Sequence, residues 1–280
     1  MDIVTPIPAA TGSQVAILGT SNYWLNSDGV TSSTTSWFVS TTNAWLEQGG
    51  IVLVSQEPIT PWSSGEPDTD TYTPGTNANN NWNAYLQAQA AMFKQLSGAV
   101  MWRPFPEANG GDHFGSTFTP AQFQLLWQYT YNYMKSQGVN NILWVFNVND
   151  WDHMNSGSTY YSGSLWYPGS AYVDIVSMDA YPPGQGAWDT VVYNWMVSTG
   201  KPFMFAESGP NGSGAAGGNN DTGVLDVIKS KFPKTFAVMI WCQGWALPKQ
   251  DGESAFMTDP AIITLSDVPA ALKNGLSTSP

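Results

Sequence analysis

The chain has 280 residues, of which 42% are hydrophobic and 11% charged, and its formal net charge at pH 7 is −12. This excess of carboxylates argues against nucleic acids and anionic polysaccharides as partners, because binding their charged groups relies on clusters of lysine and arginine. No apolar run reaches the roughly 18 residues that a membrane-spanning helix requires, so the sequence predicts no membrane partner.

Charged residues are scarce, and Ser, Thr, Asn, Gln and Gly supply most of the polar groups, a composition that is common in secreted proteins. The first twelve residues, MDIVTPIPAATG, have neither the basic segment nor the apolar segment of a signal peptide. We therefore expect the mature form of a secreted, extracellular protein, and we expect a monomer.

Runs rich in β-branched and aromatic residues recur along the chain, and several are continuously apolar, as is typical of parallel strands that are covered on both faces. In chain order, we expect strands at residues 14–20, 50–58, 98–105, 141–150, 171–182, 201–209 and 236–246. A closed eight-stranded barrel needs one strand more, and the candidate is the short run SWFVS at residues 36–40.

Amphipathic segments lie between these runs, for example residues 81–96 and residues 119–138. The second begins with Thr119 and Pro120, which favour a helix start, and stops at Gly138. Alternation of strands and helices predicts a parallel α/β architecture, and we expect a (β/α)8 TIM barrel that forms a single domain over residues 1–280. No phosphate-binding glycine motif follows the first strand, so a dinucleotide-binding fold has little support.

Carboxylates and aromatic residues collect where the expected strands end. Glu107 follows the third strand, Asp179 and Tyr181 end the fifth, Glu207 ends the sixth, and Trp245 lies at the end of the last. In a barrel the carboxyl ends of the strands form one face, and active sites of barrel enzymes lie there. These side chains are therefore predicted to line one site.

Two of the six glutamates, Glu107 and Glu207, end strands that are three strands apart. Two carboxyl groups facing each other across a barrel mouth suit cleavage of a glycosidic bond, in which one acts as an acid and the other is ionised. The 14 tryptophans and 12 tyrosines are consistent with a sugar substrate, because sugar rings stack on flat side chains. The alternative is that both glutamates are buried structural carboxylates.

Four stretches in this order, MWRPFPEANGG, NNILWVFNVND, YPGSAYVDIVSMDAYP and KPFMFAESG, resemble the retaining glycoside hydrolases of clan A. The nearest resemblance is to family 26, which contains mainly β-mannanases, with some β-1,3-xylanases and mixed-linkage β-glucanases. The resemblance implies a (β/α)8 barrel without a cofactor, with an acid/base glutamate after strand 4 and a nucleophile after strand 7. When the last expected strand is counted as strand 8, counting back places Glu107 at the end of strand 4 and Glu207 at the end of strand 7.

Matched to the family motifs, Glu107 corresponds to the acid/base and Glu207 to the nucleophile. Tyr181 corresponds to a tyrosine that hydrogen-bonds the nucleophile, and Arg103, the only arginine, to the one that we expect to orient the carboxylates. Asn109 is expected to shape the turn behind Glu107.

The sequence departs from the family pattern beside the acid/base. The family usually has a histidine immediately before this glutamate, and Pro106 stands there instead. Tryptophans that follow in the family are replaced by the sequence GDHFG, in which His113 or Phe114 is the candidate replacement for the lost aromatic platform. Further candidates for substrate contact are Trp151, Asp179 and Trp245, for which the alternatives are ordinary packing or, for Asp179, capping of a loop.

These observations predict a retaining endo-glycosidase that acts on a neutral β-linked polysaccharide, with β-1,4-mannan as the substrate that the resemblance favours. A mixed-linkage β-glucan or a β-1,3-xylan is the alternative within the same mechanism, and a carbohydrate-binding barrel without catalysis is the alternative outside it. No metal is expected, because the sequence DWDH at residues 150–153 offers too few nitrogen or sulfur ligands for a zinc site in a chain with two histidines.

Overall fold

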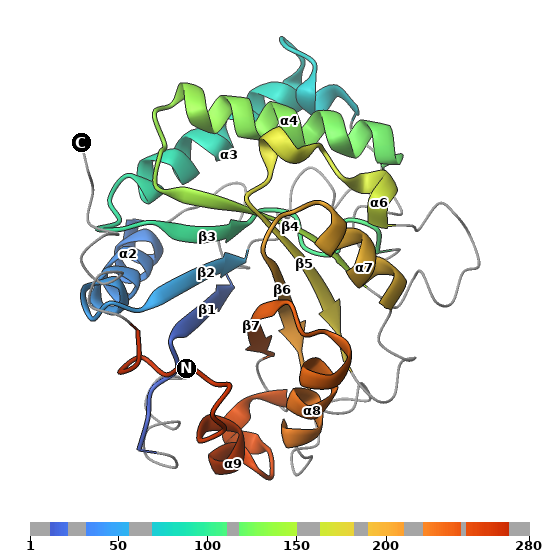
Figure 1. Cartoon of the computed structure of the whole chain (residues 1–280). Helices are drawn as coiled ribbons and strands as arrows, with labels where there is room; N and C mark the ends of the chain where they lie inside the picture. Colours follow the sequence, from blue (N-terminus) through green and yellow to red (C-terminus); the bar gives the residue numbers. More distant parts are fainter. Residues whose placement is uncertain are drawn as a thin grey trace.

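The computed structural model describes residues 12–21, 32–55, 69–110, 118–149, 163–181, 190–209, 221–241 and 245–268. In these residues seven strands form one sheet, in which each strand pairs in parallel with its neighbours in chain order and the sheet curls into a barrel (Figure 1). The strands are β1 (Ile17–Ser21), β2 (Ile51–Ser55), β3 (Val100–Arg103), β4 (Ile142–Asn149), β5 (Ile175–Ala180), β6 (Phe203–Ser208) and β7 (Thr235–Ile240).

Helices alternate with the strands and lie on the outer side of the sheet (Figure 1). The α-helices are α2 (Ser32–Glu47), α3 (Asn77–Phe93), α4 (Pro120–Ser136), α6 (Gly163–Trp166), α7 (Thr190–Ser198), α8 (Asp221–Lys231) and α9 (Glu253–Met257). Short 3-10 helices are η2 (Thr69–Tyr72), η5 (Ser170–Tyr172) and η7 (Leu247–Lys249). The predicted α/β class, with a parallel barrel-shaped sheet, is confirmed, and none of the described helices is long and apolar enough to cross a membrane.

The predicted eighth strand at residues 36–40 is wrong, because these residues lie within α2. Phe38 is 1% exposed while its neighbour Trp37 is 63% exposed, and the next buried side chains are Thr42 and Trp45. Steps of four and three residues between buried positions follow the helical period. The strand reading relied on five residues, too short a window to show that period.

The start of α4 follows the sequence prediction. The Thr119 hydroxyl accepts a hydrogen bond from the Gln122 amide, and the Gln122 side chain accepts one from the Thr119 amide, so the two residues form a capping box. Pro120 occupies the first turn, where a missing N–H costs nothing, and Gly138 follows the helix with φ 73°.

Aromatic side chains fill the space between the sheet and the helices. Among the bulkiest fully buried side chains are Trp82, Trp102, Trp127, Trp144 and Trp166. The rings of Trp102 in β3 and Trp144 in β4 are 4.8 Å apart between centroids, and Trp127 of α4 lies 6.0 Å from Trp144. These tryptophans are core residues that hold the helices on the strands.

The inside of the barrel is stacked in two layers. Toward the amino ends of the strands lies an apolar layer made of Leu53, Met101, Val145, Ile175, Met204, Ala206 and Ala237. Because inward-facing residues recur every second position along a strand, the next inward side chains lie closer to the carboxyl ends. On β2 to β5 they are polar or charged, and together with Glu207 of β6 they form a second layer, made of Ser55, Arg103, Asn147, Ser177, Asp179 and Glu207.

Candidate active site

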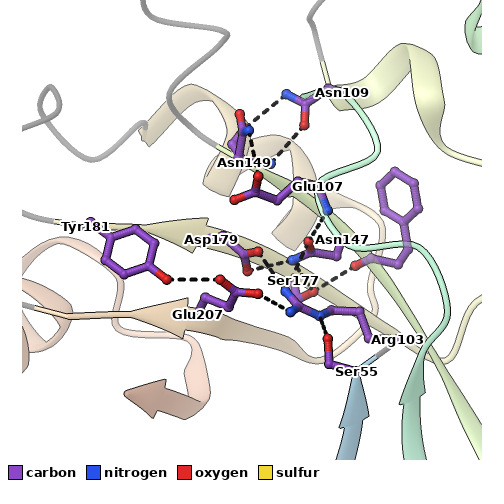
Figure 2. A network of polar contacts seen from close by, with 11 residues as sticks. Ser55, Arg103, Glu107, Asn109, Asn147, Asn149, Ser177, Asp179, Tyr181 and Glu207 are labelled. Atoms are coloured by element: carbon purple, nitrogen blue, oxygen red, sulfur yellow. Dashed lines mark hydrogen bonds and ion pairs between the residues drawn. The ribbon is translucent and has the colours of Figure 1, made fainter. Parts of the chain in front are cut away.

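The buried side chain of Arg103, at the carboxyl end of β3, is the centre of the polar layer (Figure 2). Its Nη1 lies 2.6 Å from Asp179 Oδ2, and its Nη2 forms an ion pair with Glu207 Oε1. Its Nε donates a hydrogen bond of 2.7 Å to Ser55 Oγ. One guanidinium therefore joins β3 to β2, β5 and β6, and it lies between two carboxylates.

Glu207 reaches this position through an irregularity in the pairing of β5 with β6. Met178 pairs with Phe205 and the next residue, Asp179, pairs with Glu207, so Ala206 is an extra residue on β6. Such a bulge re-aims the side chain that follows it. The second oxygen of Glu207, Oε2, accepts a hydrogen bond of 2.9 Å from the Tyr181 hydroxyl.

Glu107 lies in the turn after β3 and has φ 48°, the only positive φ of a non-glycine residue among the described residues. Its backbone N–H donates a hydrogen bond of 2.6 Å to Asn147 Oδ1, and its Oε2 accepts one of 3.3 Å from Asn149 Nδ2. One carboxylate oxygen from each of Glu107, Asp179 and Glu207 lies within 4.8 Å of the others. The structure therefore brings together the two glutamates that the sequence paired.

Asn109 fixes this turn to β4. Its Nδ2 donates to the carbonyl of Asn149 at 3.0 Å, and its Oδ1 accepts from the Asn149 amide at 2.8 Å. The Asn109 side chain is fully buried, so it supports the turn that carries Glu107 rather than facing the barrel mouth.

Burial sets the electrostatics of the site. It raises the pKa of the Asp179 carboxyl well above the ordinary value, because the loss of hydration outweighs the attraction of Arg103. It also raises the pKa of Glu207, where Arg103 opposes the rise and the charge of Glu107 adds to it. Burial and the neighbouring Glu207 raise the pKa of the Tyr181 hydroxyl, which therefore stays a donor.

Among the residues that the structure describes, Glu107, Asp179 and Glu207 form the only group of three carboxylates spaced like metal ligands. Arg103 already lies between two of them, and its positive charge disfavours a cation there.

Trp245 lies beside the site. Its ring is 5.8 Å from that of Tyr181, and it packs so closely on Gly209 that a Cβ there would lie 2.6 Å from the indole Cδ1. Its buried Nε1 makes no hydrogen bond to the described residues. The other predicted contacts, His113, Phe114 and Trp151, lie outside the described residues.

Four polar residues of the site were missed by the sequence prediction, namely Ser55, Asn147, Asn149 and Ser177. A signal for the last three exists: the polar residues in FNVND alternate with apolar ones, which places Asn147 and Asn149 on one face of the strand. Ser177 stands two residues before Asp179 on β5 and shares its inward face. Polar residues at alternate positions of a buried barrel strand therefore indicate a site, as carboxylates at strand ends do.

Comparison with known proteins identifies the family. Residues 3–267 match the model of glycosyl hydrolase family 26. The chain is 28% identical over 277 residues to a mannan endo-1,4-beta-mannosidase of Bacillus subtilis, covering 90% of this chain and 73% of that protein. It is 28% identical over 250 residues to mannan endo-1,4-beta-mannosidase A and B of Caldalkalibacillus mannanilyticus, covering 81% of this chain but 46% of that protein, so it spans about half of that relative's length.

Among solved structures, the catalytic domain of an endo-beta-1,4-mannanase from Bacillus sp. JAMB-750 superposes with a TM-score of 0.78 at 21% identity. The alignment covers 97% of this chain and 83% of that domain. This chain and that domain therefore share the same overall arrangement of strands and helices. With its fold, its paired glutamates and a family match over most of its length, the chain belongs to glycosyl hydrolase family 26.

Proposed function

We propose that this chain is a retaining endo-glycosidase that cleaves a neutral β-linked polysaccharide, with Glu107 as acid/base and Glu207 as nucleophile. The observation that carries the proposal is the short distance between the two carboxyl groups, which have an oxygen each within 4.8 Å of one another. Retaining enzymes hold their carboxyl groups about 5–5.5 Å apart, whereas inverting enzymes need roughly 6.5–9.5 Å to admit a water molecule.

In the first step, a Glu207 oxygen attacks the anomeric carbon and the bond to the leaving sugar breaks. Glu107 gives its proton to the departing oxygen, which leaves a glycosyl group bound to Glu207. In the second step, Glu107 takes a proton from water as that water attacks the same carbon. The Glu207 carboxylate is released, and the configuration at the anomeric carbon is retained.

The contacts of Glu207 suit a nucleophile that must be ionised although it is buried. Arg103 binds one carboxylate oxygen and the Tyr181 hydroxyl donates to the other. Hydrogen bonds to the charged form favour ionisation and offset part of the loss of hydration, which on balance still raises the pKa of Glu207. Both contacts also fix the direction in which the carboxylate faces the sugar.

β-1,4-Mannan is the first candidate substrate, because the relatives named above are mannan endo-1,4-beta-mannosidases. A neutral glycan also agrees with the net charge of −12, which would repel an anionic one. Because a polysaccharide does not cross membranes unaided, we place the enzyme outside the cell.

The test is release of reducing ends from mannan, galactomannan, lichenan, β-1,3-xylan and cellulose by the wild type and by Glu207→Ala. Glu47→Ala, an exposed position at the end of α2, is the matched control. We expect activity on mannan that is lost in Glu207→Ala and kept in Glu47→Ala, with the first-formed product in the β configuration by NMR. Equal binding of mannan by wild type and Glu207→Ala, without turnover in either, would contradict the proposal and indicate a binding protein.

A further inference from the structure

The side chain of Asn147, on β4, links the two proposed catalytic glutamates (Figure 2). Its Oδ1 accepts hydrogen bonds from the backbone N–H of Glu107 at 2.6 Å and from Arg103 Nη1 at 3.3 Å. Its Nδ2 donates to Asp179 Oδ1 at 2.8 Å and to Ser177 Oγ at 3.0 Å. A side-chain amide offers two donor hydrogens and two acceptor lone pairs, so all four are used and the amide has one possible orientation.

The backbone of Glu107 needs such a restraint. Its φ of 48° lies in the left-handed region, which is unfavourable for a residue with a side chain and persists only where surrounding contacts enforce it. Asn147 holds two successive amides of the turn, that of Glu107 through its side chain and that of Ala108 through its carbonyl at 3.1 Å. The preceding side chain, Pro106, can donate no hydrogen bond to the acid.

The nucleophile does not depend on Asn147 in the same way. Glu207 is held directly by Arg103 and Tyr181, and Arg103 has its own contacts to Asp179 and Ser55. The amide of Asn147 is what joins this group to the backbone of Glu107.

We propose that Asn147 is a positioning residue that holds the acid/base turn in register with the Arg103–Asp179 pair, so that Glu107 meets the leaving oxygen while Glu207 meets the anomeric carbon. This inference rests on the proposed function, in which Glu107 is the acid. In this proposal Asn147, a residue of β4, aligns Glu107, which lies in the turn after β3.

The consequence is a dependence on the leaving group. A sugar leaving group is weakly acidic and departs only when the acid gives its proton to the oxygen, whereas 2,4-dinitrophenolate departs as the anion without that proton. A misplaced Glu107 therefore slows cleavage of the polysaccharide and spares cleavage of the aryl glycoside. A general loss of structure slows both equally.

The experiment compares kcat/KM on the cleaved polysaccharide with kcat/KM on the 2,4-dinitrophenyl β-glycoside of the same sugar. For Asn147→Ala we expect a loss of about 100-fold on the polysaccharide and less than about 10-fold on the aryl glycoside. The ratio of the two rates does not depend on the fraction of folded enzyme. Asn141→Ala is the matched control, since Asn141 precedes β4 at the opposite end of the barrel and bonds the carbonyls of Phe93 and Gly98.

Asn147→Asp distinguishes the acceptor role of this side chain from its donor role. It keeps an acceptor for the Glu107 N–H and loses the donor to Asp179. We expect it to be slow on both substrates, with a ratio within about threefold of the wild type. Equal losses of Asn147→Ala on both substrates, or a ratio for Asn147→Asp as poor as that for Asn147→Ala, would overturn the proposal.

A wild type that cleaves neither the polysaccharides nor the aryl glycosides would refute the proposed function instead. Amide hydrogen exchange of residues 101–110 then tests separately whether Asn147 restrains the backbone of Glu107. Exchange at Glu107 should become faster in Asn147→Ala and stay unchanged in Asn141→Ala, and unchanged exchange in both would refute the restraint.

Discussion

The two layers inside the barrel share strands β2 to β6 but differ in chemistry. The layer near the amino ends is apolar throughout, whereas the layer near the carboxyl ends contains an arginine, two carboxylates, an asparagine and two serines. The first is held by shape and by removal of apolar surface from water, and the second by hydrogen bonds and ion pairs.

This difference bears on which changes each layer tolerates. An apolar side chain can be replaced by one of similar volume at small cost, because neighbours repack around it. Removal of Arg103 leaves two buried carboxylates without their shared cation, and no repacking supplies one. The proposed nucleophile, Glu207, therefore belongs to the less tolerant layer, and the turn that carries Glu107 is bonded to that layer through Asn147.

The largest expected effect comes from Arg103→Leu, which removes the shared cation of the polar layer. We expect the free energy of unfolding at pH 7 to fall by about 3–5 kcal/mol, because Asp179 and Glu207 remain buried without compensation. Urea denaturation followed by circular dichroism measures it. The deficit should shrink at pH 5, where the unpaired carboxyls take up protons, and a deficit that grows on acidification would contradict this account.

Met204→Ala tests the apolar layer in the same way. Met204 is fully buried, and we expect a loss of about 2–4 kcal/mol from lost contacts and the cavity that remains. The loss should be the same at pH 5 and pH 7, and kcat/KM of the folded enzyme should stay within about threefold of wild type. Abolished activity in the folded variant would mean that the polar layer depends on the apolar one.

The fold was largely predictable, because period and continuity of apolar runs are local properties of the sequence. Every one of the seven predicted strands overlaps an observed one, although the third ends at Arg103 rather than at residue 105. Pro104, which follows, has no N–H for the sheet. The run at residues 36–40 misled because five residues do not distinguish the two periods.

The site was predictable where a residue's place at a strand end decides its position, as for Asp179, Tyr181 and Glu207, whereas Arg103 was expected there from the family resemblance. The bulge at Ala206 was not, because a bulge is a property of two paired strands and the sequence shows one at a time. The same holds for the left-handed backbone of Glu107, which depends on an acceptor supplied by Asn147, 40 residues away.

Asp179→Asn tests the pH dependence that the polar layer imposes. The raised pKa values of Asp179 and Glu207 mean that the folded chain keeps protons that the unfolded chain releases. Ionising these two buried carboxyls lowers the free energy of unfolding. This loss is absent below the ordinary pKa values of 3.8 and 4.5, and it grows as pH rises through the pKa values of the folded state. We expect Asp179→Asn to flatten this fall and to change the stability at pH 7 by about 1 kcal/mol. Met204→Ala, which removes no titrating group, should keep the wild-type slope, and an unchanged slope in Asp179→Asn would disprove the assignment.

Gly209→Ala acts on the rim of the polar layer without touching its charges. The added Cβ would lie 2.6 Å from Trp245 Cδ1, so the indole must move away from its place beside Tyr181. If Trp245 stacks on sugar, KM should rise by about 3- to 10-fold while kcat changes little, since one such contact contributes about 1 kcal/mol. An unchanged KM, measured on the substrate that the wild type cleaves, would show that Trp245 only packs.

Gly223→Ala has the smallest expected effect, because Gly223 lies outside both layers. It is an exposed residue near the start of α8, and an added Cβ would meet nothing within 4 Å. Alanine restricts the unfolded chain more than glycine does, so we expect a gain of about 0.5 kcal/mol with activity unchanged. Thermal and urea unfolding measure it, alone and together with Met204→Ala. The two changes in the free energy of unfolding should add if α8 and the apolar layer respond independently. A double variant that departs from the sum by more than about 0.5 kcal/mol would mean that the outer helix and the barrel interior are energetically coupled.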